Sequence, residues 1–100
     1  MSYHVHFHPR VLEYFLRPEV VSADRREALA EACIADLTHG GESFRLDPSR
    51  RVRPGSACFW YDRIFFDRGA WQYFLFAVSD ARAAMGVLIV GYVERLSPPD

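Results

Sequence analysis

The stretch CFWYDRIFFDRGAWQYFLFAV, residues 58–78, decides the fold of this chain. Residues 58–66 and 71–78 are rich in aromatic and β-branched side chains, which are enriched in β-strands. The intervening Asp67-Arg68-Gly69 fits a hairpin loop in which the glycine takes a positive φ. The sequence therefore predicts two antiparallel strands joined by a tight turn.

Two further strands are predicted outside this hairpin. Residues 87–93 form a long apolar run, and Gly91 within it indicates a bulge or a close contact. Near the N-terminus, apolar residues and histidines alternate from Tyr3 to Phe7. This period of two is typical of a short strand.

Two helices are predicted between the first strand and the hairpin. Pro9 suits the first turn of a helix, and Pro18 ends or kinks that helix. Asp24 and Glu27 form a capping-box pattern for a second helix, and Gly40-Gly41 is a stop signal for it. The short connection between the two favours an antiparallel helical hairpin. The predicted apolar face of the second helix contains Leu29, Cys33 and Leu37, with Ala30 and Ile34 beside them.

Length and composition fit a single domain over residues 1–96, because half of the 100 residues are hydrophobic and can form a core. We expect an α+β fold in which an N-terminal strand and a two-helix hairpin pack on an antiparallel sheet of about four strands. Residues 44–57 are predicted to form a loop, with a short strand near 50–53. Residues 97–100 are predicted to be a disordered tail.

Both faces of the predicted strands are apolar. One face of the strand after the turn carries Phe74, Phe76 and Val78, and the other carries Trp71, Tyr73, Leu75 and Ala77. The helices can cover only one of these faces. The other must be covered by the loop from 44 to 57, by a partner, or by a second copy, since large apolar patches mark interaction sites.

The charge distribution singles out one region of an almost neutral chain. The formal net charge is −1, and all 12 basic residues are arginines, whose planar guanidinium suits phosphate or carboxylate. Residues 9–43 carry four arginines against seven acids (−3), whereas residues 44–68 carry six arginines against three acids (+3). The positive region could grip phosphates; the alternative is a solvated loop whose arginines pair with the acidic helices. The candidate nucleic-acid-binding residues are Arg45, Arg50, Arg51 and Arg68.

His4, His6 and His8 share one face of the first predicted strand, where two imidazoles could reach one metal ion. A solvent-exposed strand face is the alternative, and His8 could instead cap the following helix. Cys33 and Cys58 form neither a metal motif nor a disulfide framework. No cofactor is predicted, and metal binding by the histidines stays an alternative.

The first residues are not expected to form a signal peptide, because histidines interrupt the only early apolar stretch. No apolar run reaches the roughly 18 residues that a membrane-spanning helix requires. We therefore expect a cytoplasmic protein without a membrane partner.

The order strand, helix, helix, loop and three antiparallel strands resembles that of the RelE/ParE toxin superfamily over residues 3–95. Four stretches carry the resemblance. HPRVLEYF at 8–15 resembles the opening of the first helix, and LTHGG at 37–41 resembles the end of the second. WYDRIFFDRGAWQYF at 60–74 resembles the central hairpin of the family, and GVLIVGYVER at 86–95 resembles its last long strand.

This resemblance implies the toxin of a toxin–antitoxin system, which an antitoxin binds and silences. RelE-like members are metal-independent endoribonucleases that cleave mRNA in the ribosome, whereas ParE-like members inhibit DNA gyrase without a nuclease site. For a ribonuclease, basic and polar residues on the sheet activate the 2′-hydroxyl and stabilise the transition state. The catalytic candidates that the resemblance indicates here are Arg53, Arg63, Tyr92 and Arg95.

Three hypotheses follow from the sequence. The first is a RelE/ParE-like toxin acting on RNA or on a protein target; its nuclease version requires the four catalytic candidates to converge on one face of the sheet. The second is a non-enzymatic module that uses the uncovered apolar face to dimerise or to hold a partner chain. The third is a histidine-dependent metal protein.

Overall fold

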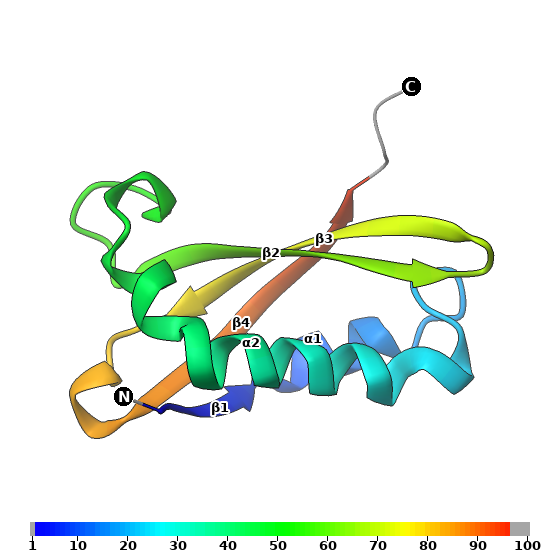
Figure 1. Cartoon of the computed structure of the whole chain (residues 1–100), viewed down its shortest axis with the longest axis horizontal. Coiled ribbons are helices and arrows are strands. Elements are labelled where there is room, and N and C mark those ends of the chain that lie inside the picture. Colours follow the sequence, from blue (N-terminus) through cyan, green and yellow to red (C-terminus); the bar gives the residue numbers. More distant parts are fainter. Residues whose placement is uncertain (1, 97–100) are drawn as a thin grey trace.

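In the computed structural model, which describes residues 2–96, one curled four-stranded sheet carries the helices on a single face (Figure 1). The strands are β1 (His4–Phe7), β2 (Cys58–Asp67), β3 (Ala70–Ser79) and β4 (Val87–Leu96), in the order β1-β4-β3-β2. The α+β class is thus confirmed. The predicted tail at 97–100 lies outside the described residues.

The sheet is mixed, so the prediction of a wholly antiparallel sheet was wrong at one edge. β2, β3 and β4 are antiparallel neighbours, but β1 runs parallel to β4, with His4 opposite Val87. Parallel neighbours cannot be joined by a tight turn. Here β1 and β4 are connected through the helices, β2 and β3, and this connection is long enough for β1 to pair in parallel with β4.

The predicted hairpin is present, with a tighter turn than expected. Asp67 pairs with Ala70, which leaves a two-residue loop of Arg68 and Gly69. Both loop residues have positive φ, at 54° and 74°. Two consecutive positive φ values are typical of the turns that match the twist of antiparallel strands. Asp67 therefore belongs to the strand and not to the loop.

The expected irregularity at Gly91 is a β-bulge. Ala77 lies opposite Tyr92, whereas the next residue, Val78, lies opposite Val90. Gly91 therefore has no opposing residue on β3. The extra residue shifts the alternation of β4, so that Val90 and Val93 are both buried although they are three positions apart.

The helices differ from the predicted hairpin. α1 (Pro9–Phe15) has only seven residues and begins as predicted, since the Nδ1 of His8 accepts a hydrogen bond from the Arg10 amide at 3.1 Å. A 3₁₀ turn, η1 (Ala23–Arg25), then leads into α2 (Arg26–Leu46). The capping box was wrong because Asp24 lies within this turn and the N-cap residue Arg25 makes no side-chain cap.

The glycine stop signal was also wrong, because α2 continues through Gly40-Gly41 to Leu46. Gly41 is buried where the helix crosses the sheet. A Cβ at this position would lie 2.9 Å from Leu88 Cδ1 and 3.2 Å from Tyr3 Cδ2. Close approach between helix and sheet, and not helix termination, explains this glycine.

The segment after α2 is shorter than the predicted loop. It contains a 3₁₀ turn, η2 (Pro48–Arg50), and one isolated bridge in which Arg51 pairs with Phe59. This bridge is all that forms, among residues 47–57, of the short strand expected near 50–53.

The core lies between the helices and one face of the sheet, as expected. Phe74, Phe76 and Val78 are fully buried there, and Phe15 of α1 packs edge-on against both phenylalanines. α2 contributes Leu29, Cys33 and Leu37 to the same core. None of the helices within residues 2–96 is long and apolar enough to cross a membrane.

Candidate functional site

The face of the sheet that points away from α1 and α2 is the candidate site, and we call it the open face. Strand pairing places its residues in rows, because directly opposed residues share a face. The open face consists of Trp60, Asp62, Ile64 and Phe66 on β2, Trp71, Tyr73, Leu75 and Ala77 on β3, and Tyr92, Glu94 and Leu96 on β4.

Large apolar side chains on the open face are exposed to solvent. Trp71 is 61% exposed, Ile64 56%, and Phe66 and Tyr92 46% each. Phe66 and Trp71 stand opposite one another and form an edge-on pair with ring centroids 5.3 Å apart. Scattered exposed apolar residues are ordinary in proteins, but adjacent ones on a single face form a patch.

The loop after α2 covers only the outer strand of this face. Arg50 reaches over β2, where its Nη1 donates to the Trp60 carbonyl at 3.2 Å and to Asp62 Oδ1 at 2.9 Å. Its guanidinium also lies over the Phe44 ring, 4.7 Å from the centroid. At the centre of the face, on β3, Tyr73, Leu75 and Ala77 are half-buried.

The carboxylates of the open face already have donors within the chain. Asp62 accepts a second hydrogen bond, from the Tyr73 hydroxyl at 2.9 Å. Partial burial opposes ionisation of Asp62, but Arg50 and Tyr73 outweigh it and lower the pKa of this carboxyl. Glu94 accepts from the Tyr92 hydroxyl at 2.9 Å, and this hydrogen bond is the main reason that the pKa of Tyr92 is raised.

The four catalytic candidates do not converge. Tyr92 lies on the open face, and Arg53 is exposed in the loop before β2. Arg63 lies on the helix side, where it donates to Asp36, and Arg95 donates to the carbonyls of Glu19 and Val20. The condition that the nuclease hypothesis requires is therefore not met.

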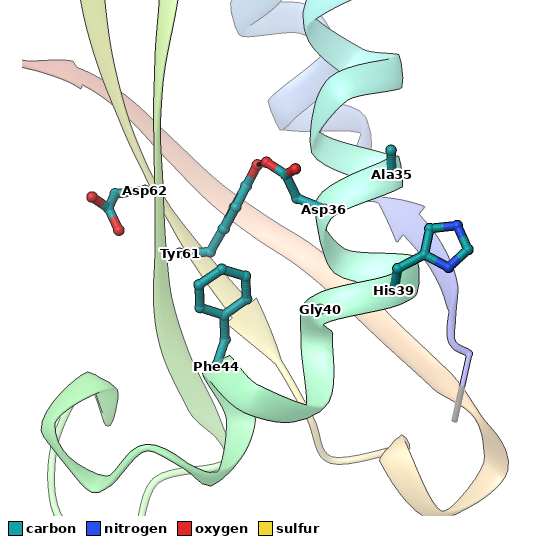
Figure 2. A pocket seen from close by; sticks show the side chains of 7 residues that line it. All are labelled: Ala35, Asp36, His39, Gly40, Phe44, Tyr61 and Asp62. Carbon is teal, nitrogen blue, oxygen red and sulfur yellow. Dashed lines mark hydrogen bonds between the residues drawn. The ribbon is translucent and has the colours of Figure 1, made fainter.

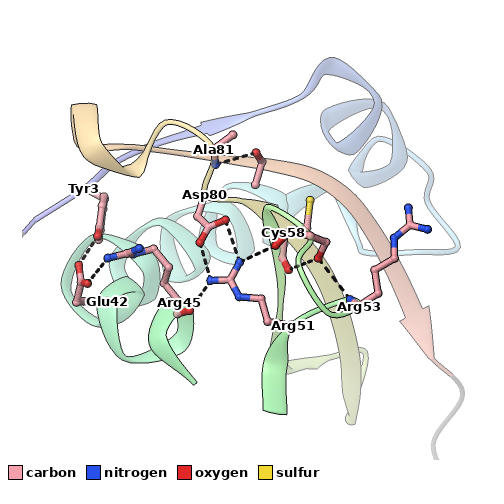
Figure 3. Close-up of polar contacts among 10 residues, drawn as sticks. Tyr3, Glu42, Arg45, Arg51, Arg53, Cys58, Asp80 and Ala81 are labelled. Carbon is pink, nitrogen blue, oxygen red and sulfur yellow. Dashed lines mark hydrogen bonds and ion pairs between the residues drawn. The ribbon is translucent and has the colours of Figure 1, made fainter. Parts of the chain in front are cut away.

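The four nucleic-acid-binding candidates are held by partners within the chain. Arg45 pairs with Glu42 at 2.5 Å and Arg50 with Asp62, as described above. The guanidinium of Arg51 donates hydrogen bonds to both carboxylate oxygens of Asp80, at 2.6 and 3.0 Å (Figure 3). Arg68 donates to the Pro18 carbonyl. Only Arg45 pairs with an acid of a helix, as the alternative proposed. Arg50 and Arg51 pair with acids outside the helices.

We expect Arg51→Ala to lower the free energy of unfolding by about 2 kcal/mol, because it leaves the nearly buried Asp80 carboxylate without its partner. Arg53→Ala is the matched control and should change stability by less than about 0.5 kcal/mol, because Arg53 is exposed. Urea unfolding measures both. Equal effects of the two substitutions would contradict a structural role for Arg51.

A half-buried polar cluster between α2 and β2 was not anticipated from the sequence. Asp36 accepts hydrogen bonds from the Tyr61 hydroxyl and from Arg63. Asp36 and Tyr61 line a hollow of about 480 Å³ together with His39 and Phe44 (Figure 2). Burial is the main cause of the raised pKa of Tyr61. Because the Asp36 carboxylate is occupied by two donors, the cluster serves to join helix and sheet.

The histidines and cysteines do not gather. His4 and His6 are exposed on β1, and His8 caps α1. Burial raises the pKa of the Cys33 thiol to about 12, which makes it a poor nucleophile. Cys33 and Cys58 are both free. Within residues 2–96, no three histidine, cysteine or carboxylate side chains are placed to hold a metal ion.

The open face therefore differs from every other surface of the described chain in combining exposed aromatic side chains with carboxylates that are already paired. Aromatic side chains are typical of binding surfaces. No protein-family model matches the chain, and neither a curated protein nor a solved structure matches it at a significant level.

Proposed function

We propose that this chain is a non-enzymatic protein-binding module whose binding surface is the open face of its sheet. The observation that carries the proposal is the exposure of Ile64, Phe66, Trp71 and Tyr92 on a face that no helix covers. Burial of such side chains against a partner removes apolar surface from water, which is the main driving force of association.

The size of the patch supports the proposal. With about 200 Å² for an aromatic side chain, these four residues expose about 400 Å² of apolar surface. The half-buried Tyr73, Leu75 and Ala77 between them extend it. The largest apolar patch on an ordinary monomer is about 300–600 Å² and is often functional.

The arrangement of charged groups also favours binding over phosphate chemistry. The arginines that could have formed a phosphate site donate to Glu42, Asp62, Asp80 and a backbone carbonyl. Recruiting them to a nucleic acid would break these contacts. The open face, in contrast, needs no rearrangement to receive an apolar partner.

We expect Trp71→Glu to abolish most of the fluorescence enhancement of an apolar dye such as ANS, because the charge replaces the most exposed of the four apolar side chains, beside Phe66. Leu16→Glu is the matched control, since Leu16 is also 61% exposed but lies on the helix side. Circular dichroism should show that both variants fold. Equal dye binding by the wild type and Trp71→Glu would remove the support for this surface.

A RelE/ParE-like toxin, silenced by an antitoxin, is a second candidate. The observation that favours it is the element order, in which an N-terminal strand and the helices precede three antiparallel strands. In this version the chain acts by binding a protein target such as gyrase. Inducing the gene in bacteria should then arrest growth, and normal growth of cells that contain folded protein would count against the toxin.

A further inference from the structure

We propose that the open face binds a second copy of this chain, stacked face to face about a two-fold axis. This inference rests on the proposed function and specifies its partner. Three neighbouring rows of the open face each cross β2, β3 and β4. The bulky row is Ile64–Tyr73–Leu96, the central row is Asp62–Leu75–Glu94, and the hollow row is Trp60–Ala77–Tyr92.

The bulky row and the hollow row have complementary shapes. Tyr73 is a large, half-buried side chain at the middle of its row, and its ring leans towards β2, where its hydroxyl donates to Asp62. At the middle of the hollow row stands the methyl group of Ala77, between the large rings of Trp60 and Tyr92. The bulky row therefore has a large side chain (the projection) where the hollow row has a small one (the depression), and the two rows lie at equal distances on either side of the central row.

A two-fold axis along the central row superposes these features. Rotation about this axis exchanges the bulky row of one copy with the hollow row of the other, while each strand stays over its own counterpart. Tyr73 then packs on the partner's Ala77, and the partner's Tyr73 packs on Ala77. Alternation of large and small side chains across facing positions is how tightly packed layers fit together.

The available area agrees with such a dimer. The exposed residues supply about 400 Å² of apolar surface from each copy. The half-buried side chains of the three rows add to this and bring the face towards the roughly 800 Å² that each partner contributes to an interface of standard size. Two copies can thus cover the patch that the fold leaves exposed.

The central row sets a limit on affinity. In the stacked pair, Asp62 and Glu94 face their own counterparts, and like charges directly opposite one another are destabilising. Arg50 and Tyr73 partly offset this for Asp62, and the Tyr92 hydroxyl does so for Glu94. The dimer should therefore be reversible, and Glu94→Gln should lower its dissociation constant by up to about fivefold.

The test exchanges the projection and the depression. Sedimentation equilibrium from about 1 μM to 1 mM should show a monomer–dimer equilibrium for the wild type. Ala77→Tyr fills the depression and should raise the dissociation constant at least about tenfold, although it adds apolar surface. The double variant Tyr73→Ala/Ala77→Tyr moves the projection to the other row and should restore dimerisation towards the wild-type level. Circular dichroism and thermal melting confirm that each variant folds.

The outcomes separate this inference from the proposed function. If the wild type is monomeric but still binds dye in a Trp71-dependent way, the proposal that the partner is a second copy is wrong. The proposal that the open face is a binding surface is then retained. A monomer without such dye binding would overturn both. A dimer that withstands Ala77→Tyr and Trp71→Glu but is lost in Leu16→Glu would place the contact on the helix side and overturn this inference.

Discussion

Replacing two adjacent glycines should change stability in opposite directions. Gly41→Val should lower the free energy of unfolding by about 2–3 kcal/mol, because overpacking in a filled core forces its neighbours to move. The Cβ would lie 2.9 Å from Leu88, which is fully buried, and 3.2 Å from Tyr3, which is almost so. Both side chains belong to the packed core, so the added atoms require them to move.

Gly40→Ala is the matched control for this result. Its Cβ would meet only Phe44, at an ordinary 3.7 Å. Alanine in a helix interior is about 1 kcal/mol more favourable than glycine, so this variant should melt roughly 4–8 °C above the wild type. Urea unfolding and thermal melting measure both. Stabilisation by Gly41→Val would show that the helix does not approach the sheet as closely as described.

Asp67→Ala should lower the free energy of unfolding by about 3 kcal/mol, because two donors of Ser22 lose their acceptor. Asp67 is buried at the end of β2 and accepts from the Ser22 amide at 2.9 Å and from the Ser22 hydroxyl at 2.5 Å. These bonds attach the tip of the hairpin to the chain before η1. Ser22→Ala, which removes only the hydroxyl, should cost about 1 kcal/mol.

The contribution of Asp67 should depend on pH. Burial opposes its ionisation, but the hydrogen bonds from Ser22 and the nearby Arg68 and Arg25 outweigh burial and lower its pKa in the folded state. A carboxyl with a lowered folded pKa stabilises the protein above its unfolded pKa of about 4, and this stabilisation is lost as the pH falls through the folded value. The difference between wild type and Asp67→Ala should therefore shrink below about pH 4. A difference that grows on acidification would contradict this assignment.

Local chemistry made the hairpin predictable, whereas the helix boundary depended on distant residues. Asp67-Arg68-Gly69 lies between two β-prone runs, and such a turn depends on its own backbone preferences. Gly41 has the same local appearance as a helix terminator. Its actual role depends on Leu88 and Tyr3, which are far away in the sequence, and no local pattern contains that information.

In the candidate site, too, local sequence patterns predicted some features, whereas others depended on residues far away in the sequence. Alternation along β3 predicted which residues would share the uncovered face, because side chains on a strand alternate with a period of two. Tyr92 and Arg95 were expected together but are three residues apart on one strand, which places them on opposite faces. The partners of Arg51 and Arg63 lie on other elements, so the sequence alone left open whether these arginines were free.

The parallel pairing of β1 with β4 also has a consequence for the order in which the chain can fold during synthesis. Of the four strands that the structure describes, β1 is synthesised first, and β4, beside which it lies in the sheet, is synthesised last. The β2–β3 hairpin can form by local contacts well before β4 leaves the ribosome. Non-local pairings are entropically costly and slow to form. β1 therefore has no strand to pair with until β4 has been synthesised. Addition of β1 to the edge of the sheet should be among the last events of folding.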